Sequence, residues 1–565
     1  MRFQLPLLLL DIFRRDAHGR LRVWLLRGSL PVVVAGSLAL ALLMSGCGTS
    51  PGVTRLSSKT PSDKVKLPET VFLRSVVCQD CHPAEYEEWR TSMHSYAQHS
   101  PIFLAFNKTV LKNSGGTLGT FCVRCHTPIG ISSGETSIIV NDKRSEAALD
   151  SVGCVSCHSA NQPNQEASSV YHVPVPGDPE PIIYGPFYGS DEPGAPDDPS
   201  LRLIKSPHTS RHTDYITQAR LCGNCHDVFS PDGFRIEEAF SEWRNGPYAR
   251  AGISCQNCHM GPIPGKPFMQ DQLAENYIVD PNVVPGAYKR HRSSHRFTGP
   301  DYSVLLAFGK TDLGLDQASF KQLGETLEDQ RTTLFRNAAT MQVKHPDAVT
   351  PGSTMPIVVS VTNSGAGHNL PTGFAAERQV WLEVIVSDAT GHQLYSSGTL
   401  DSAKDLRDED SEDVQKGTLA LDKDLFNLQA TFTSAGFRGT DAESISTVNR
   451  LLDPVPFVTP ATTPALITGY PPGGRIFKRG IPPLATKTAR YDVKIPANAH
   501  GPLQLTVRLR YRNLPPHLLK ELDIADLRPK LRIVDMQEYE EKIQVGRGDL
   551  TAAPRSSDLA RTAAR

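Results

Sequence analysis

The sequence predicts a multidomain protein in which a mainly α-helical and irregular region is followed by an all-β, immunoglobulin-like sandwich. Three observations support this prediction. The pentad Cys-x-x-Cys-His occurs five times between Cys78 and His259, in a stretch that is rich in Pro and Gly. Beyond residue 337, several segments alternate apolar and polar residues, as half-buried strands do. A chain of 565 residues is also long enough for two domains.

The N-terminal residues predict export. Residues 30–44 form a mostly apolar run that follows several arginines and precedes small residues, which is typical of a signal peptide and short for a membrane span. The run ends in Leu-Met-Ser-Gly before Cys47, which resembles the bacterial lipobox; the alternative is an ordinary cleavage site with an unrelated cysteine. We expect a lipoprotein signal peptide over residues 1–47, lipidation of Cys47, and a Ser-, Thr- and Pro-rich tether over residues 48–68.

The five pentads have the chemistry of covalent haem attachment. In a c-type haem, two thiols add to the porphyrin vinyl groups, and the adjacent His binds the iron as the proximal ligand. Zinc sites would need paired Cys-x-x-Cys units, and neither zinc nor disulfides explain a His after every second Cys. We therefore expect five covalently attached c-type haems. The cysteines expected to hold them are Cys78, Cys81, Cys122, Cys125, Cys154, Cys157, Cys222, Cys225, Cys255 and Cys258. The expected proximal ligands are His82, His126, His158, His226 and His259.

The pentahaem domain is expected over residues 69–300, with porphyrins in place of much of an apolar core. Its clearest helix is predicted over residues 83–94, because Pro stands near the start and acidic residues follow in the first turns. In a continuous helix, His82 and His94 would lie about 18 Å apart. Both axial nitrogens of one iron lie about 2 Å from it. His94 is therefore expected to serve a different haem from the one that His82 binds.

The distal ligands are expected to be mostly histidines. The histidines of this domain outside the pentads are His94, His99, His172, His208, His212, His291 and His295. Residues 208 and 212, and residues 291 and 295, have the spacing that shares one helix face, so one ligand from each pair is expected. Any one of these histidines could instead be a surface or core residue. Three methionines offer a thioether as the alternative ligand: Met93, Met260 and Met269.

Two stretches of this domain resemble multihaem cytochromes of the cytochrome c-554 type. They are Cys-x-x-Cys-His-Pro-x-x-Tyr-x-x-Trp with a following Met-His, from Cys78 to His94, and the segment from Leu221 to Asp227 with His208 upstream. The resemblance covers roughly residues 77–297 and implies bis-His haems in close pairs and an electron-transfer role. It also implies that His94, His208 and His295 are distal ligands. Small members of that family carry four haems, so the ligand of the additional haem stays open, and the remaining candidates are His99, His172, His212 and His291.

The second half of the sequence is predicted to form a helix followed by strands. A connecting helical segment is expected over residues 301–336, where apolar residues recur at helical spacing. The β-sandwich is expected over residues 337–545, with a long insertion at residues 401–474 and a disordered tail at residues 546–565. Strands are predicted at residues 357–362, 380–386 and 503–512 from β-branched content and alternation. The acidic run at residues 408–413 lacks EF-hand spacing and is interpreted as a solvated loop.

One loop of the β region carries a further ligand candidate. Gly367-His368-Asn-Leu-Pro371-Thr-Gly373 has the composition of a tight loop between strands, with a His at its tip. Gly-His-x-x-Pro-Thr-Gly also resembles a loop of larger multihaem cytochromes, in which a β domain presents a His to the haem domain. We expect His368 to be a distal ligand; the alternative is a turn with a surface His. The other histidines of this half are expected to face solvent: His345, His392, His500 and His517.

These features predict an exported electron-transfer protein of the bacterial cell envelope. We expect a lipid-anchored pentahaem cytochrome, on the periplasmic side or outer surface of the outer membrane, that exchanges electrons with other redox proteins. The alternative is a nitrite or hydroxylamine reductase with one open haem. The surplus of histidines and the absence of a Cys-x-x-Cys-Lys variant favour electron transfer over catalysis. A formal net charge of −1 gives no reason to expect nucleic acid as a partner.

Overall fold

The computed structural model divides the chain into two units, residues 1–64 and residues 65–565. The described residues are 14–15, 21–22, 72–113, 115–116, 118–135, 141–161, 182–203, 208–229, 235–302, 317–436, 444–447 and 473–546. In the first unit, β1 (Arg14–Arg15) and β2 (Leu21–Arg22) form a short antiparallel pair. Cys47, the apolar run before it, the tether and His172 lie outside the described residues. The following paragraphs concern the second unit.

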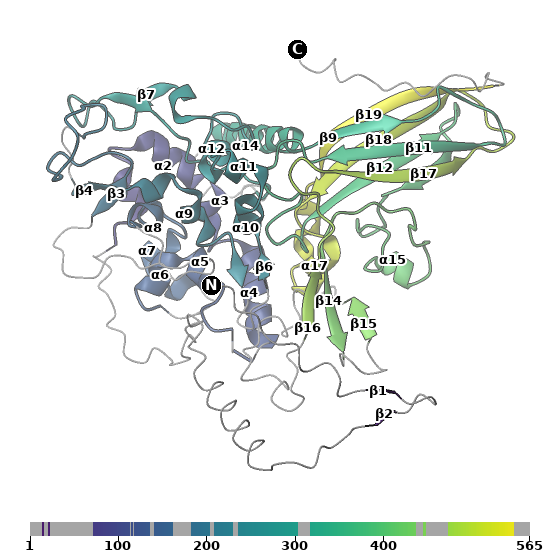
Figure 1. Cartoon of the computed structure of the whole chain (residues 1–565), viewed down its shortest axis with the longest axis horizontal. Helices are drawn as coiled ribbons and strands as arrows, with labels where there is room; N and C mark the ends of the chain where they lie inside the picture. Colours follow the sequence, from purple (N-terminus) through teal and green to yellow (C-terminus); the bar gives the residue numbers. More distant parts are fainter. Residues whose placement is uncertain are drawn as a thin grey trace. The chain divides into compact units, whose positions relative to one another are not determined.

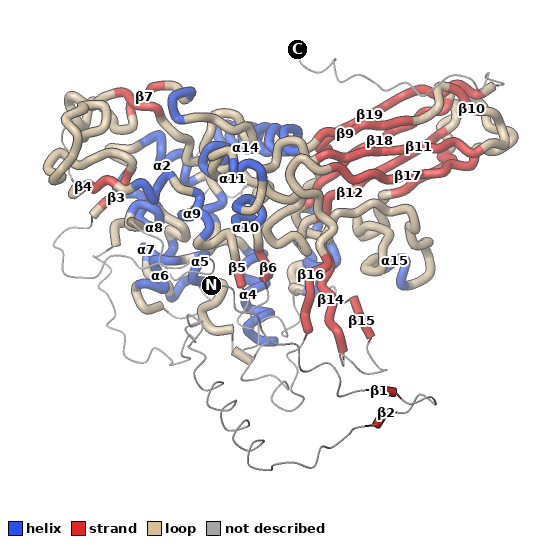
Figure 2. Tube along the Cα trace, viewed as in Figure 1, coloured by secondary structure: helices blue, strands red, loops and turns tan. Residues whose placement is uncertain are grey.

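Up to residue 302, short helices are joined by long loops (Figures 1 and 2). The helices are α2 (Pro83–Arg90), α3 (Met93–Tyr96), α4 (Pro101–Asn113), α5 (Val123–His126), α6 (Pro128–Ser132), α7 (Glu146–Leu149), α8 (Cys154–His158), α9 (Ala219–Gly223), α10 (Ala239–Arg244), α11 (Pro247–Arg250) and α12 (Cys255–His259). The strands are β3 (Ile183–Gly185), β4 (Ser210–His212), β5 (Val228–Phe229), β6 (Arg235–Glu237), β7 (Glu275–Tyr277) and β8 (Lys289–His291). The third and fifth pentads coincide with the one-turn helices α8 and α12.

The helix predicted over residues 83–94 is broken, which corrects the expectation of a continuous helix. α2 ends at Arg90, and Ser92 caps a new helix by accepting a hydrogen bond from the backbone N–H of His94. A Ser in extended backbone geometry offers the side-chain acceptor that a new helix N-terminus needs, so it starts α3 rather than continuing α2. The 18 Å expected between His82 and His94 in a continuous helix therefore does not apply, and packing decides where His94 lies.

After the gap at residues 303–316, the chain forms one long helix and then sheets. α14 (Gln317–Ala338) lies where the connecting helix was expected. The strands that follow are β9 (Thr340–Lys344), β10 (Ala348–Val349), β11 (Thr354–Thr362), β12 (Gln379–Ser387), β13 (Gln393–Ser397), β17 (Thr486–Lys494), β18 (Leu503–Arg512) and β19 (Val534–Val545). They form a five-stranded sheet in the order β10-β19-β18-β12-β13 and a three-stranded sheet in the order β17-β11-β9. Figure 1 shows β9, β11, β17 and β12, β18, β19 running together.

The two sheets share one apolar core, because their alternating strands turn the apolar side chains toward each other. Leu382 of β12 pairs in register with Leu509 of β18, and both are fully buried with Ile357 of β11 and Val493 of β17. The described strands thus form a sandwich-like β region. The specific immunoglobulin topology stays a prediction.

The outer face of β12 is covered as well, which alternation alone did not predict. Trp381 is fully buried and donates its indole N–H to the carbonyl of Gly398 at 3.0 Å. The predicted insertion runs alongside β12, where Leu382 donates its N–H to the carbonyl of Phe426 at 3.1 Å. Its described part also contains α15 (Glu412–Gln415). A small sheet is formed by β14 (Thr431–Gly436), β15 (Ser444–Thr447) and β16 (Gly473–Phe477), which extends past the predicted end of the insertion at residue 474.

The acidic run is solvated only in part, with Glu409 exposed and Ser411 buried, and the expectation that His517 faces solvent is wrong. Ser411 is fully buried and donates its hydroxyl to Asp401 at 2.7 Å. The ring of His517, 13% exposed, bonds to the buried carboxylate of Asp405 at 3.1 Å. His517 stands on α17 (Pro516–Glu521), whose packing brings it over the acidic segment. A buried charge needs a partner, and this imidazole supplies it.

The haem-motif region and the β region pack against each other at several places. Leu518 and Leu519 of α17 share an apolar core with Val110 of α4 and with the first Cys of the second pentad, Cys122. A second place is the loop that carries His368, described below. No helix in the described part of the chain is long and apolar enough to cross a membrane.

Candidate haem-binding site

Four of the five pentad histidines are held by the same type of hydrogen bond. The ring Nδ1 of each lies within hydrogen-bond distance of a backbone carbonyl oxygen. The pairs are His82 with Ile278 (2.6 Å), His126 with Ala97 (2.8 Å), His158 with Tyr184 (2.8 Å) and His259 with Thr298 (2.9 Å). A carbonyl can only accept, so Nδ1 carries the hydrogen and Nε2 keeps its lone pair for a metal. The pentads thus present correctly protonated imidazoles before any ligand is considered.

Three pentad histidines face a second histidine at one common separation. The ring centroids lie 6.4 Å apart in each pair, with interplanar angles of 51°, 19° and 15°. The pairs are His226 with His94, His158 with His295, and His259 with His368. Two imidazoles bound on opposite sides of one metal ion at about 2 Å have ring centroids about 6 Å apart. The donor pairs therefore fit a haem iron between them.

The first pentad has a second histidine in its electrostatic environment. The imidazole of His208 is affected by the charges of His82 and His158. Its Nδ1 lies 3.2 Å from the hydroxyl of Ser210. His208 is thus the described histidine associated with the first pentad.

The second pentad has a different environment. Phe103 of α4 stacks on the ring of His126, with centroids 3.6 Å apart and an interplanar angle of 6°. Among the described residues, no second histidine makes a ring contact with His126, and the candidate His172 lies outside them.

The remaining three candidates make other contacts, and that of His291 is of the same type as the contacts of the pentad histidines. A ring nitrogen of His99 lies 2.7 Å from the carbonyl of Leu149. His212 stacks on Tyr188 at 4.1 Å and lies 3.4 Å from Asp214. Nδ1 of His291 lies 2.6 Å from the carbonyl of Leu273. Both i,i+4 pairs lie in strand or loop, so the shared helix face considered for them does not exist.

Burial keeps the facing imidazoles neutral. Desolvation lowers the pKa of His94 to about 3 and the pKa values of His126, His226 and His295 to about 4. It also lowers the pKa of His368. A neutral imidazole is the form that binds a metal, so these side chains need lose no proton to do so.

Contacts between pentads give their order in space. The side chain of Cys78 lies beside that of Cys154, which brings the first and third pentads together. In the same way, Cys125 contacts Cys225, and Cys222 contacts Cys255. Cys157 also lies in the electrostatic environment of Cys225. The pentads therefore form a line, first–third–fourth–fifth, with the second pentad beside the fourth.

Residues 77–159 match the family model of cytochrome c554 and c-prime. The match covers the first three pentads. The fold also resembles the crystal structure of a penta-heme cytochrome c552 from Thermochromatium tepidum, with a TM-score of 0.51 and 17% identity over 84% of this chain and 99% of that chain. No curated protein sequence matches the chain. The comparisons therefore support the resemblance of the first pentads to the c-554 type and a multihaem cytochrome fold for most of the chain.

Several residues that shape the site were missed by the sequence analysis. The carbonyl acceptors for the pentad histidines lie 26 to 196 residues away from their partners in sequence. Backbone carbonyls carry no sequence signal, so spacing could not reveal them. Glu242, which bonds to the His368 loop, was likewise missed, because a Glu on a short helix resembles any surface residue.

Proposed function

We propose that the protein is an exported pentahaem cytochrome that transfers electrons between redox partners in the cell envelope. The observation that carries this proposal is the repeated facing of imidazoles at one separation of 6.4 Å, three times over. When bound, the haems supply reversible one-electron chemistry, and the chain supplies ligands, spacing and shielding from water. Two strong imidazole ligands leave no position for a substrate, which favours transfer over catalysis.

The ligand assignment follows from the contacts. Each pentad's two Cys hold one haem, and its His is the proximal ligand. In this proposal, His94 is the distal ligand for the fourth pentad, His295 for the third, His368 for the fifth and His208 for the first. His99 and His212 are not ligands in it, and His291 stays a candidate for a haem whose distal ligand is open. The immunoglobulin-like topology of the β region belongs to the same proposal, with that region donating His368.

The order of the pentads provides a route for electrons. The first and fifth pentads stand at the two ends of the line, and the second stands beside the fourth. Electrons would enter near one end and leave near the other, through neighbours that touch. The route makes the fourth pentad, with His226 and His94, the junction of the protein.

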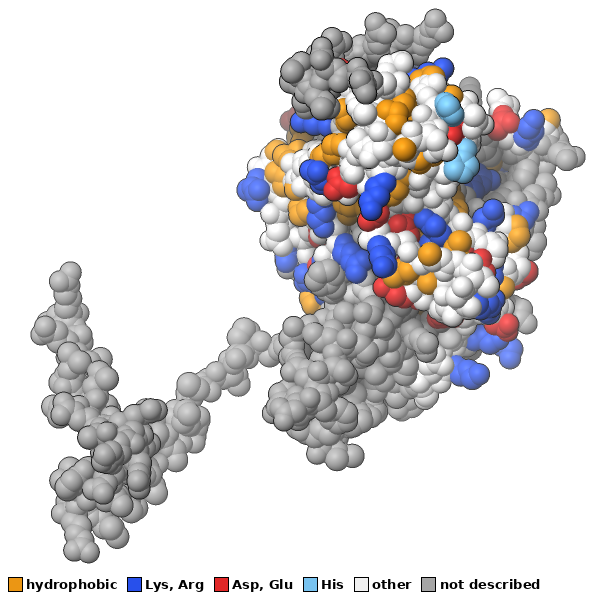
Figure 3. Space-filling model, turned by 90° about the vertical axis from the view of Figure 1, so that its right-hand side faces the viewer, with side chains coloured by type: hydrophobic (Ala, Val, Ile, Leu, Met, Phe, Trp, Pro, Cys, Tyr) orange, Lys and Arg blue, Asp and Glu red, His pale blue; other side chains and the backbone are white. Residues whose placement is uncertain are grey.

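Partners and location follow from the N-terminus and the surface. We propose that Cys47 is lipidated and anchors the protein to the outer membrane, where it meets other redox proteins. On the face drawn in Figure 3, basic and acidic side chains are interspersed, which suits transient docking better than one strong field would. If Cys47→Ala leaves the protein in the membrane fraction as firmly as wild type, the anchor is not a lipid on that residue.

The proposal is tested by counting haems and spin states. A pyridine haemochrome assay should give five haems per chain. Electron paramagnetic resonance (EPR) of the oxidised protein should show mainly low-spin signals, and a redox titration should resolve several one-electron steps. Fewer than five haems in matured protein, or mostly high-spin signals, would reject the proposal.

A second candidate function rests on the second pentad. His126 makes its ring contact with Phe103 rather than with another described histidine, so this pentad is the place where an open haem of a nitrite or hydroxylamine reductase would lie. The discriminating variant is His172→Ala. If wild type lacks a high-spin signal and the variant gains one, His172 closes the site and the protein is a carrier. If wild type already shows the signal and reduces nitrite or hydroxylamine at enzymatic rates, the reductase is favoured.

A further inference from the structure

The loop that carries His368 contacts the haem-motif region at several points, and the carboxylate of Glu242 accepts most of the hydrogen bonds between them. We infer that Glu242 of α10 is a positioning residue, which holds His368 opposite His259 and so determines how firmly this imidazole binds iron. The inference rests on the proposed function, in which His368 is a distal ligand. It assigns to this chain a residue that tunes ligation without itself touching the metal.

The loop is first shaped from inside the β region. Asn363 is fully buried and donates its side-chain amide to the carbonyls of His368 at 2.8 Å and Ile481 at 2.9 Å. Its side-chain oxygen accepts from the N–H of Ala366 at 3.0 Å. Gly365 is required there, because a Cβ would lie 1.9 Å from the carbonyl oxygen of Asn337. These contacts form the loop but do not fix it against the haem-motif region.

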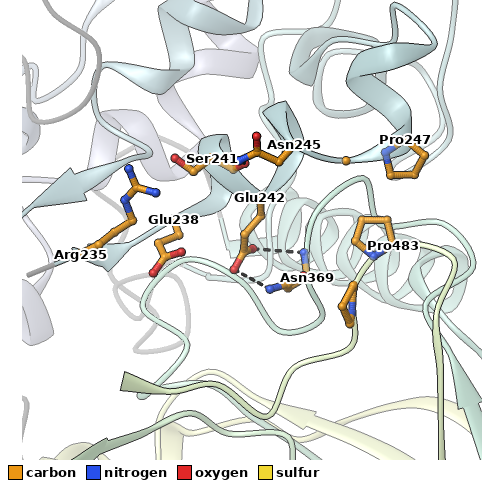
Figure 4. A pocket seen from close by; sticks show the side chains of 10 residues that line it. Arg235, Glu238, Ser241, Glu242, Asn245, Pro247, Asn369 and Pro483 are labelled. Carbon is orange, nitrogen blue, oxygen red and sulfur yellow. Dashed lines mark hydrogen bonds between the residues drawn. The ribbon is translucent and has the colours of Figure 1, made fainter. Parts of the chain in front are cut away.

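Glu242 provides the fixation from the other side. Its carboxylate accepts from the backbone N–H of Asn369 at 3.2 Å and from the side-chain amide of Asn369 at 2.8 Å (Figure 4). It also accepts from the hydroxyl of Thr372 at 2.5 Å. Lys478 also donates to it at 3.2 Å. The side chain of Glu242 is 10% exposed, so little water competes for these bonds. Three of the four donors belong to the loop itself.

The contacts lead directly to the imidazole. The carbonyl of Asn369 lies 3.0 Å from Nδ1 of His368 and can only accept, so it fixes the hydrogen on Nδ1. Nε2 is then left free to bind a metal. The ring planes of His368 and His259 make an angle of 15°, and their centroids lie 6.4 Å apart. Glu242 thus holds Asn369, and Asn369 orients His368. Such outer-shell partners set the orientation and basicity of a ligating His.

Other contacts cover only part of the loop: Gly367 lies against Trp243 and Tyr248, and the Tyr248 hydroxyl donates to the carbonyl of Ser364 at 3.5 Å. A cavity of about 330 Å³ lies beside the carboxylate, lined by Arg235, Glu238, Asn245, Pro247, Asn369 and Pro483 (Figure 4). With open space on that side, the loop depends on directed hydrogen bonds. Glu238 lines the same cavity and also forms an ion pair with Lys478. Within the described residues, its carboxylate makes no hydrogen bond with the loop. Glu238 is therefore the matched control for Glu242.

The experiment compares Glu242→Ala, Glu242→Gln and Glu238→Ala with wild type in the full matured chain. His368→Ala first identifies which low-spin EPR signal belongs to this haem. We expect Glu242→Ala to weaken that same signal, to shift one potential in the redox titration, and to raise the affinity of the reduced haem for CO roughly 10- to 100-fold. Glu242→Gln, which keeps the shape and one acceptor, should lie between. Glu238→Ala should match wild type.

The inference is overturned if Glu242→Ala and Glu238→Ala give the same EPR spectrum and CO affinity. Equal changes in both variants would assign the effect to Lys478 and also overturn it. A wild-type protein in which His368→Ala removes no low-spin signal would instead reject the proposed ligand. The two failures are therefore distinguishable.

Discussion

At the scale of single residues, the decisive feature is the protonation of the imidazoles. Backbone carbonyls hold Nδ1 of His82, His126, His158 and His259, and the carbonyl of Asn369 does the same for His368. Burial disfavours the charged ring. Both effects select one neutral tautomer with Nε2 available. The fold thus selects the tautomer of these histidines through backbone hydrogen bonds and burial.

His94 and His99 provide a matched pair for testing this at one residue. His94 faces His226 across 6.4 Å, whereas a ring nitrogen of His99 bonds to the carbonyl of Leu149. We expect His94→Ala to convert one low-spin haem to high-spin in the EPR spectrum. His99→Ala should keep every low-spin signal. Loss of a low-spin haem in the His99 variant alone would reverse the assignment.

At the scale of elements, α17 joins the two regions. Leu518 and Leu519 insert between α4 and the β region, and His517 on the same helix bonds to Asp405 of the acidic segment. One short helix therefore contributes to an apolar core and to an ion pair. Its apolar and polar contacts can be tested separately.

Leu519→Ala tests the apolar contact. Leu519 is fully buried, so truncation should lower the free energy of unfolding by about 2–5 kcal/mol, from lost transfer energy and a residual cavity. Leu484, which is 60% exposed, is the control, and Leu484→Ala should change it by less than about 0.5 kcal/mol. Denaturant unfolding of the matured protein measures both. Equal values would show that α17 does not hold the regions together.

The ion pair predicts a pH dependence. Burial by itself disfavours a charged His517, but its bond to Asp405 and the charge of Asp410 outweigh this and raise its pKa. For the neighbouring carboxyl of Asp408, burial is itself the main cause of a raised pKa, which reaches about 7. Both groups bind protons more tightly in the folded chain than in the unfolded chain. The stabilisation from His517 is therefore complete below about pH 6.5 and that from Asp408 below about pH 3.9, and each is lost as the pH rises through the pKa of the folded state. The other charged groups of this cluster are Asp401, Arg512 and Glu521.

Hydrogen exchange at pH 6 and pH 8, corrected for the intrinsic rate, measures this dependence. Protection of residues 401–422 and 516–522 should be greater at pH 6. His517→Gln should weaken the difference, because one of the two groups is gone. Protection that increases toward pH 8 in wild type would contradict the sign.

At the scale of the whole molecule, the regions are connected by buried polar contacts as well as by α17. The guanidinium of Arg378 forms two hydrogen bonds with the carboxylate of Asp301, at 2.8 and 3.0 Å, and a third with the hydroxyl of Tyr511 at 3.1 Å. Arg378 also lies in the electrostatic environment of His226 and His368. Structural integrity and the haem environment are therefore linked at this contact.

Removing the carboxylate charge tests that link. Asp301→Asn leaves the guanidinium of Arg378, 15% exposed, without its counter-charge. We expect a loss of about 1–3 kcal/mol of unfolding free energy, less than for a fully buried pair because Asp301 is 35% exposed. Asp271→Asn, at an exposed position, is the control. A melting temperature unchanged from this control would show that the pair does not stabilise the contact.

The sequence by itself determined the features that depend on neighbours along the chain. The pentads are local, since the two Cys and the His act within five residues, and their geometry forms on one-turn helices such as α8 and α12. Alternation at residues 503–512 predicted a strand with one buried face, and the observed burial alternates as expected, because the side chains of a strand point to opposite faces.

Only the tertiary structure decided which histidines face each other. His94 and His226 are 132 positions apart, and His368 reaches His259 from another region, so no spacing rule connects them. The burial of His517 and the docking by Glu242 are also long-range results, whereas the break at Ser92 has a local cause in its cap. Packing of distant segments selects one partner among chemically equal imidazoles, and that choice is made by the whole fold rather than by any local pattern.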